Sequence, residues 1–463
     1  MSENSTQKKR TTINPIVILL GILLFATSLT YLVSSGSYDR DGKLVKPGTY
    51  QVLDKEISPS TLFRTEQKGQ LAHPVSLPQT LVSIPKGLAK SSGLIFMVLI
   101  IGGMFGIVKA TGAIDIGLEQ VVSKVKGNVY ILVAGLTTIF SAGSTFLGLA
   151  SEYLLIIPVM VAMAKRMGLS AIIGLAIVTV GVKVGYIASV TNPIPLTIAQ
   201  PLVGLPIFSG ASTRFVFYLI FLTIGIGFLI YMVRREGYRH GDPIELSGAI
   251  LSHRQKIMLA ILTIGIGVIV YASSKWQWKH EELSAFYIGL SILLAACSGL
   301  GASQAADAFV SGMKKILLAT FLIGVATAVS VVLQEGMILD TIVYHLTSIV
   351  SGSGAGIAAV GMFVSQFLLD FLIPSTSGQA AVSMPILGPI GQLTGVSGQT
   401  TVLAFLYGNA LTNMITPTSG TLLAYLATAE VSWIAWAKFI FPLFIIFGIV
   451  SIILLNVSVA IGF

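Results

Sequence analysis

Apolar runs of about 20 residues recur along nearly the whole chain, and they restrict its fold more than any other feature. At 1.5 Å per residue, a helix of about 20 residues spans a hydrocarbon layer about 30 Å thick. Hydrophobic residues make up 54% of the 463 residues and charged residues only 10%, far from the balance of a soluble protein. The sequence therefore predicts an all-α polytopic membrane protein rather than several soluble domains.

The charges and the rare residue types exclude several classes of function. The net charge of +9 fits orientation in a membrane and attraction to the lipid bilayer, so no nucleic-acid partner is expected. The single cysteine, Cys297, excludes an intrachain disulfide, and together with five scattered histidines it predicts no metal site. No Walker-type glycine loop occurs, so we expect no direct ATP coupling, no cofactor and no enzymatic activity.

Lysines and arginines predict how the chain is oriented. If residues 1–13 are cytoplasmic, a first span at 14–34 leads to an external cap segment at 35–90, and later basic clusters return to the cytoplasm. Outside the cap, Arg214 is among the few basic residues that this topology places outside. We expect a multi-pass protein of the cytoplasmic (inner) membrane with an external C-terminus. The long first apolar run predicts a span rather than a cleaved signal.

Two segments fit this topology only if each enters and leaves the membrane on one face. Residues 128–165 are flanked by cytoplasmic lysines and contain "SAGST", which predicts a re-entrant hairpin with its tip near Gly143–Thr145. Residues 352–392 have the same design, with a tip in "PSTSGQ" at 374–379 and no basic flank. One hairpin is therefore expected from each face of the membrane.

Each expected hairpin is followed by an apolar helix with an interruption. In the helix at 170–204, "SVTNP" begins at Ser189, and in the helix at 398–429, "TPTSG" begins at Thr416. Proline, glycine and capping residues in the middle of an apolar run predict a break at that point.

The two interrupted helices belong to an internal repeat. Their alignment pairs Gly181 with Gly408, and an amphipathic arm precedes each hairpin, "TGAIDIGLEQVV" in one case and "EGMILDTIVYHL" in the other. We predict inverted repeats at 91–233 and 314–459, joined by a linker at 234–313 with two transmembrane helices. This organisation is typical of secondary transporters.

Irregular backbone inside a membrane must be covered by protein or water, because lipid cannot satisfy its N–H and C=O groups. A break exposes the N-terminus of a half-helix, which attracts anions, and freed carbonyls that can hold a cation. We therefore expect a site for a carboxylate and a small cation. Its candidate substrate-binding residues are Ser144, Thr145, Glu152, Lys183, Ser189, Thr191, Asn192, Ser375, Thr376, Ser377, Gln379, Asn409, Asn413, Thr416, Thr418 and Ser419. Its coupling-ion candidates, for Na+ or H+, are Asp370, Ser144, Asn192, Ser375 and Thr418.

Two charged residues near the breaks leave alternatives open. Lys183 lies about 20 Å along its helix from the cytoplasmic end, where an ionisable side chain is costly and usually functional. It binds a substrate carboxylate, replaces a cation, or forms a closed structural pair with Glu152, the expected counter-charge. Asp370 is either a cation or proton site or a cap of the second hairpin.

Four stretches carry a resemblance to a known family: "IPKGLAKSSGLIFMVLIIGGMFGIVKATGAIDIGLEQ", "NPIPLTIAQPLVGLP", "PSTSGQAAVSMPILGPI" and "LTNMITPTSG". They resemble the YfcC-like basic amino acid antiporters, within the C4-dicarboxylate anaerobic carrier (DcuC) family of the ion transporter superfamily. The resemblance implies a secondary active transporter with alternating access of the elevator type. It also implies a homodimer in which a scaffold subdomain holds a mobile transport subdomain.

The resemblance further implies that serine, threonine and asparagine at the tips and breaks bind a substrate carboxylate and sodium. The implied substrate is a basic amino acid of the arginine or ornithine type, with a C4-dicarboxylate or other organic anion as the alternative. Three residues depart from the implied pattern: Lys183 stands in place of a glutamine-like residue, Asn409 in place of an acidic one and Asp370 in place of asparagine.

Two other classes of function compete with a carrier. A channel would need a continuous polar pore, and two opposed hairpins argue instead for a closed site near the middle of the membrane. A membrane-embedded sensor or scaffold is the other alternative, because the changes at Lys183 and Asn409 could have disabled transport.

Overall fold

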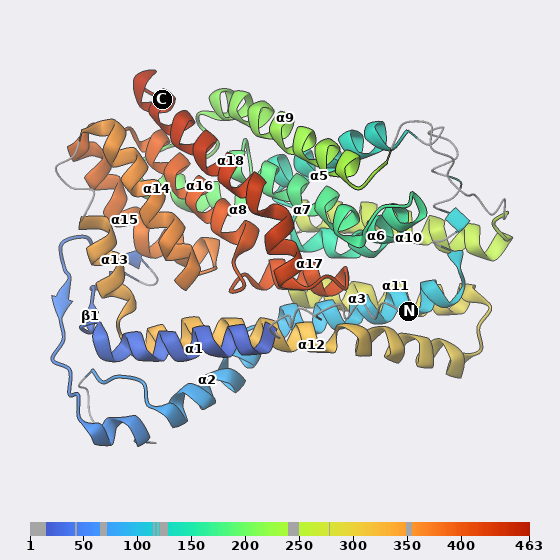
Figure 1. Ribbon diagram of the computed structural model, residues 1–463, viewed down its shortest axis with the longest axis horizontal. Helices are drawn as coiled ribbons and strands as arrows, with labels where there is room; N and C mark the ends of the chain where they lie inside the picture. Colours follow the sequence, from blue (N-terminus) through green and yellow to red (C-terminus); the bar gives the residue numbers. More distant parts are fainter. Residues whose placement is uncertain are drawn as a thin grey trace, which may run out of the picture.

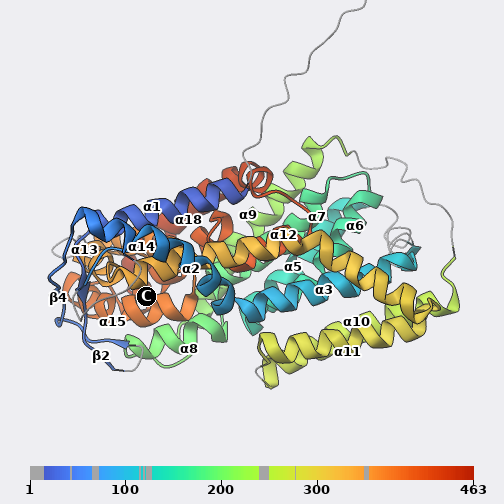
Figure 2. The same cartoon turned by 90° about the horizontal axis from the view of Figure 1, so that it is seen from below.

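The computed structural model describes residues 15–41, 44–64, 72–113, 116–117, 120, 128–238, 250–276, 278–348 and 354–463. The described chain is almost entirely helical, and its helices form two layers (Figure 1 and Figure 2). The predicted all-α membrane architecture is therefore confirmed. The expected cytoplasmic residues 1–13 lie outside the described residues.

The first layer contains six helices: α1 (Pro15–Leu32), α2 (Leu77–Lys90), α3 (Ser92–Ala110), α10 (His253–Lys275), α11 (His280–Ser298) and α12 (Ala302–Glu335). α1, α2 and α3 pack against α12, α11 packs against α3, and α10 packs against α11. The second layer contains α5 (Val129–Leu147), η2 (Ser151–Leu155), α6 (Ile157–Arg166), α7 (Ala171–Ala188), α8 (Pro193–Leu202), α9 (Ala211–Arg235), α13 (Leu339–Ser348), α14 (Ala355–Leu372), α15 (Thr376–Thr394), α16 (Gly398–Ile415), α17 (Gly420–Thr428) and α18 (Trp433–Ala460). Figure 1 shows α1 and α12 side by side along one edge, with the second layer above them.

The two layers meet mainly where α12 contacts α17, while α12 packs on its other sides against α1, α2 and α3. Eight apolar stretches of the described chain are long enough to cross a membrane, and the broken stretch Ala171–Leu202 counts as one of them. The segment 234–313, expected to be a linker, holds α10, α11 and the first turns of α12, which begins at Ala302.

Both helix breaks lie where the sequence places them, because local chemistry produces them. α7 ends at Ser189, which has a left-handed φ of 42°, and α8 begins with Asn192 as its N-cap and Pro193 in its first turn. α16 ends at Thr416, which is extended because Pro417 follows it. α17 then begins with Ser419 as its N-cap.

The tip predicted at Gly143–Thr145 is wrong, because α5 continues through these residues to Leu147. The chain reverses at Gly148, which has a φ of 75°, and continues into η2. The small residues remain helical because they allow close packing: the Ser144 hydroxyl donates to the Val182 carbonyl on α7 at 2.9 Å. The second hairpin turns at Ile373–Ser375, at the start of the predicted tip, and the residues after it open α15.

Two glycines bring each broken helix close to the hairpin that precedes it. A Cβ on Gly185 of α7 would lie 2.4 Å from the Ser141 carbonyl oxygen of α5. A Cβ on Gly408 of α16 would lie 2.6 Å from the Phe367 nitrogen of α14. Each broken helix therefore packs against the first arm of its hairpin at backbone distance.

Short strands in the expected cap segment attach it to the arm that precedes the second hairpin. β1 (Gly36–Ser37) pairs with β4 (Gln51–Val52), and β2 (Arg40–Asp41) pairs with β3 (Leu44–Val45), both antiparallel. Arg40 Nη2 donates to the Asp340 carboxylate of α13 at 2.6 Å. The first arm, "TGAIDIGLEQVV", lies largely outside the described residues.

Candidate functional site

One face of α7 is polar and faces the second hairpin. Lys183 and Tyr186 are three residues apart and therefore share this face, while Gly185 faces α5. The Tyr186 hydroxyl shares a hydrogen bond of 2.8 Å with Thr376, the first residue of α15. Lys183, Tyr186 and Thr376 are partly exposed residues at this meeting point of α7 and the hairpin tip.

Asp370 supplies the negative charge opposite Lys183. Its side chain is fully buried near the end of α14, and it interacts electrostatically with Lys183. Within the described residues, the Lys183 ammonium makes no direct salt bridge or hydrogen bond, to Asp370 or to any other group. A buried carboxylate needs a compensating charge, and Lys183 provides it without contact.

Amide side chains of α16 hold the Asp370 carboxylate in place. Asn409 Nδ2 donates to Asp370 Oδ1 at 2.6 Å, and Asn413 Nδ2 donates to Asp370 Oδ2 at 2.7 Å. Asn409 Nδ2 also donates to Gln379 Oε1 of α15 at 2.7 Å. The two residues on α16 are four apart and share one face, so they link both arms of the second hairpin.

Gln366 extends this network and was not among the predicted site residues. Gln379 Nε2 donates to the Gln366 side-chain oxygen at 3.1 Å and to the Gln366 backbone oxygen at 2.7 Å. Ser383 Oγ donates to Gln366 Oε1 at 2.8 Å. Gln366 Nε2 is buried and has no hydrogen-bond partner among the described residues. The available signal was its spacing, since Gln366 lies four residues before Asp370 on one face of α14.

Glu152 is not the counter-charge of Lys183, so the predicted pairing is wrong. Its Oε2 accepts a hydrogen bond from the Ala150 N–H at 2.8 Å, in the loop before η2. Its carboxylate interacts electrostatically with Tyr287 of α11 and Tyr425 of α17. Because α5 runs past the predicted tip, Glu152 lies on the side of η2 that faces α11 and α17.

Arg214 is a functional candidate that was not among the predicted site residues. Its side chain is fully buried at the start of α9. Its Nε donates to the Ser189 carbonyl at 3.2 Å, and its Nη2 donates to the Val190 carbonyl at 3.1 Å. Its Nη1 reaches Gln399 Oε1 at 3.2 Å. A guanidinium therefore occupies the freed carbonyls of the first break.

The hydroxyls of the first break are engaged with backbone groups. Thr145 Oγ1 accepts from the Val190 N–H at 3.0 Å, and the Thr191 hydroxyl donates to the Phe146 carbonyl at 3.3 Å. The Ser189 hydroxyl donates to the Tyr186 carbonyl one turn before it. These contacts join the first hairpin to the break and satisfy its irregular backbone.

Asn192 differs from these residues because its side-chain amide nitrogen has no hydrogen-bond partner among the described residues. Its Oδ1 accepts from the Ile194 N–H at 3.0 Å as the cap of α8. Its Nδ2 is buried and has no partner among the described residues. A Cβ on Gly148 would lie 2.8 Å from Asn192 Oδ1, so the side chain lies at the tip of the first hairpin.

The hydroxyls of the second break bond to one another and to the second hairpin. Thr416 and Thr418 share a hydrogen bond of 2.8 Å, and Thr418 also donates to the Phe371 carbonyl at 3.1 Å. Ser419 and Ser375 cap α17 and α15. Ser377 is exposed in the first turn of α15.

The predicted residues thus form two groups, one at each hairpin. Ser144, Thr145, Ser189, Thr191 and Asn192 surround the first break, where the described contacts are mostly structural. A second group lies between α7, the second hairpin and α16: Lys183, Asp370, Thr376, Gln379, Asn409 and Asn413. No cluster of three or more His, Cys, Asp or Glu that could hold a metal occurs in the described part of the chain.

We expect Arg214→Gln to lower the free energy of unfolding by about 2 kcal/mol or more, because two buried carbonyls lose their donors. Thermal unfolding in detergent measures the change. Arg235→Gln is the matched control, because this arginine is exposed at the other end of α9. Equal midpoints for the two variants would show that the guanidinium does not stabilise the break.

Comparison with known proteins gives a consistent family. The family model described as C4-dicarboxylate anaerobic carrier matches residues 14–460. An uncharacterized protein of Haemophilus influenzae is 25% identical over 99% of this chain and 99% of its own length. The "Putative basic amino acid antiporter YfcC" of Escherichia coli is 26% identical over 91% of this chain and 91% of its own length. The solved structure of the Alcanivorax borkumensis YdaH transporter covers 97% of this chain and 99% of its own, with 14% identity and a TM-score of 0.43.

Proposed function

The chain belongs to the C4-dicarboxylate anaerobic carrier family and is a membrane transporter, and from this premise we propose that it exchanges amino acids across the cytoplasmic membrane. The proposed substrate is a basic amino acid of the arginine or ornithine type, as the name of the Escherichia coli relative suggests. We propose secondary active transport by alternating access.

The observation that carries this proposal is the open Lys183–Asp370 pair. The two charges interact electrostatically, yet no direct salt bridge joins them in the described residues. Lys183 is a partly exposed residue, and its ammonium keeps its donors for a charge-assisted hydrogen bond to a substrate carboxylate. Before substrate binds, the negative charge of the buried Asp370 balances the positive charge of Lys183, so the site is neutral overall.

Acceptor oxygens beside Lys183 suit the amino group of the same substrate. Tyr186, Thr376 and Asn413 are partly exposed residues of α7, α15 and α16, the helices that meet at the second hairpin. Hydroxyl and amide oxygens can accept the three N–H donors of an α-ammonium. A carboxylate on Lys183 and an ammonium on these oxygens would orient an amino acid in one direction.

An elevator-like movement of inverted repeats is part of the proposal. Each broken helix packs at backbone distance against its hairpin, at Gly185 in one half and Gly408 in the other. We propose that the second layer, which carries both breaks, moves against the first layer along α12. The homodimer, the cytoplasmic N-terminus and the external C-terminus are proposed on the resemblance and on the distribution of lysine and arginine.

The two breaks differ in how they can use a coupling ion. At the first break the Arg214 guanidinium already occupies the carbonyls of Ser189 and Val190, so we propose that it replaces a diffusible cation there. At the second hairpin, Asp370 Oδ1 and Gln379 Oε1 lie together in the core, where both accept from Asn409 Nδ2. We propose this cluster as the site of a coupling proton or sodium ion.

A C4-dicarboxylate is the second candidate substrate, and one observation favours it. Asn192 Nδ2 is a buried donor without a partner among the described residues, and it lies at the N-terminus of α8, where anions are stabilised. A dicarboxylate could therefore bind Lys183 with one carboxylate and this helix end with the other.

Counterflow in proteoliposomes tests the proposal. Vesicles loaded with unlabelled ornithine should accumulate labelled arginine saturably, and vesicles loaded with succinate should not. Saturable exchange of labelled succinate alone would instead support the dicarboxylate carrier. A voltage-driven current without saturation would indicate a channel, and the absence of any flux across amino acids and organic acids would indicate a sensor or scaffold.

A further inference from the structure

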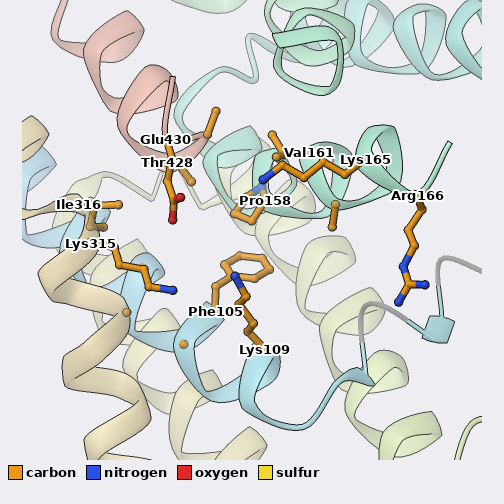
Figure 3. Close-up of a pocket in the computed structure, with 15 residues that line it drawn as sticks. Phe105, Lys109, Pro158, Val161, Lys165, Arg166, Lys315, Ile316, Thr428 and Glu430 are labelled. Carbon is orange, nitrogen blue, oxygen red and sulfur yellow. The ribbon is translucent and has the colours of Figure 1, made fainter. Parts of the chain in front are cut away.

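A basic cavity lies between the two layers, away from the breaks. It has a volume of about 310 Å³ and is lined by α3 and α12 on one side and by α6 and α17 on the other. Figure 3 shows Lys109, Lys165 and Lys315 pointing into the same space, each from a different helix. The carboxylate of Glu430 lies beside them in the same view.

The charges of this cavity do not neutralise one another. Within the described residues, the ammonium groups of Lys109, Lys165 and Lys315 make no hydrogen bond or salt bridge. Glu430 is the carboxylate among the lining residues, so positive charge predominates even without counting Arg166. A concave site with converging cations stabilises a multiply charged anion.

Close helix packing forms the apolar wall of the cavity. A Cβ on Gly312 of α12 would lie 2.1 Å from the Gly102 carbonyl oxygen of α3, so the two helices touch at backbone level. The lining between the lysines is apolar and includes Phe105, Val161 and Ile316. The site therefore offers lysine donors at one end and hydrocarbon contact beside them.

Exposed apolar side chains follow the cavity residues along the sequence of α12. After Lys315, this helix exposes Leu317, Leu318 and Phe321, which are 57%, 52% and 40% exposed. A free phosphate ion would use only the lysines, whereas a phospholipid would also cover the apolar side chains. The cavity volume is sufficient for a headgroup but not for a whole lipid.

We propose that this cavity binds the phosphate of an anionic phospholipid, with the headgroup on Lys109, Lys165 and Lys315 and an acyl chain along α12. Basic pockets between transmembrane helices are a known mode of headgroup recognition. Because α3 and α12 belong to one layer and α6 and α17 to the other, a bound lipid would link the two layers. This inference does not depend on the substrate proposed above.

Thermal unfolding of the full-length protein in nanodiscs tests the proposal. Phosphatidylglycerol in place of phosphatidylcholine should raise the midpoint by about 3 °C or more, because a ligand that binds only the folded state stabilises it. In Lys109→Gln/Lys315→Gln this rise should be at most half as large. Lys86→Gln/Lys90→Gln is the matched control, since it removes two exposed lysines of α2 outside the cavity and should retain the full rise.

Two further measurements distinguish a lipid phosphate from free phosphate and supply a second variant in case the first does not fold. Inorganic phosphate in phosphatidylcholine nanodiscs should raise the midpoint by less than phosphatidylglycerol, and an equal rise would show a free-anion site instead. If Lys109→Gln/Lys315→Gln does not fold, Lys165→Gln alone is compared in the same way. The proposal is overturned if the rise with phosphatidylglycerol is absent in the wild type, or is equal in the cavity and control variants.

Discussion

Replacing Lys183 by glutamine is expected to reduce counterflow of labelled amino acid at least about tenfold, because a charge-assisted hydrogen bond to the substrate carboxylate is lost. The same change leaves the buried Asp370 carboxylate without its counter-charge, which should cost about 3–5 kcal/mol of stability. Exchange in proteoliposomes measures the first effect and thermal unfolding measures the second.

A double variant separates these two effects. Lys183→Gln/Asp370→Asn removes both charges, so it should recover most of the lost stability but not the exchange activity. Lys438→Gln, an exposed lysine on α18, controls for the loss of one positive charge. If Lys183→Gln exchanged substrate with the wild-type rate, KM and ion dependence, the lysine would have no role in binding.

Asn409→Asp is expected to reduce exchange about tenfold or more, because it places a second carboxylate in contact with Asp370. The Asn409 amide nitrogen now lies 2.6 Å from Asp370 Oδ1, and two carboxylates at this distance cannot both be ionised. The amide contact to Gln379 would be lost as well. Initial rates of counterflow across a pH series measure the defect, and it should be larger at high pH, where the second carboxylate is forced to ionise.

The informative control transposes the two residues. Asp370→Asn/Asn409→Asp keeps one carboxylate and one amide in contact, so it should restore exchange to within about threefold of the wild type. The resemblance implied asparagine at 370 and an acid at 409, and the structure shows that these two departures lie in one hydrogen bond. A double variant as inactive as the single one would show that the carboxylate must stand on α14.

Structural features that depend only on neighbouring residues could be predicted from the sequence with nearly correct positions. The breaks at Ser189 and Thr416 depend on proline, capping residues and the conformation of one or two neighbours, so they lie where they were expected. The long apolar helices followed from length and hydropathy alone. These features need no partner from another part of the chain.

Features that depend on distant partners could not be predicted. The run of small residues around Ser144 looked like a turn, but it is a packing surface for α7. Glu152 was paired with Lys183 because both are charged and near the first break, yet the carboxylate opposite the lysine comes from α14. Gln366 was missed because its local signal is only a spacing of four residues from Asp370, and a glutamine in an apolar helix is interpretable only when its neighbours across the core are known.

Arg214 also affects how a transport current would be interpreted. Its positive charge is covalently part of α9, whereas a bound metal ion would dissociate on one side of the membrane. In the proposed cycle this charge moves out and back with the protein, so over a full turnover it adds nothing to the net charge transferred. Steady-state current should therefore report only the charges of the exchanged solutes and of any ion carried at Asp370, while Arg214 contributes only to transient displacement currents.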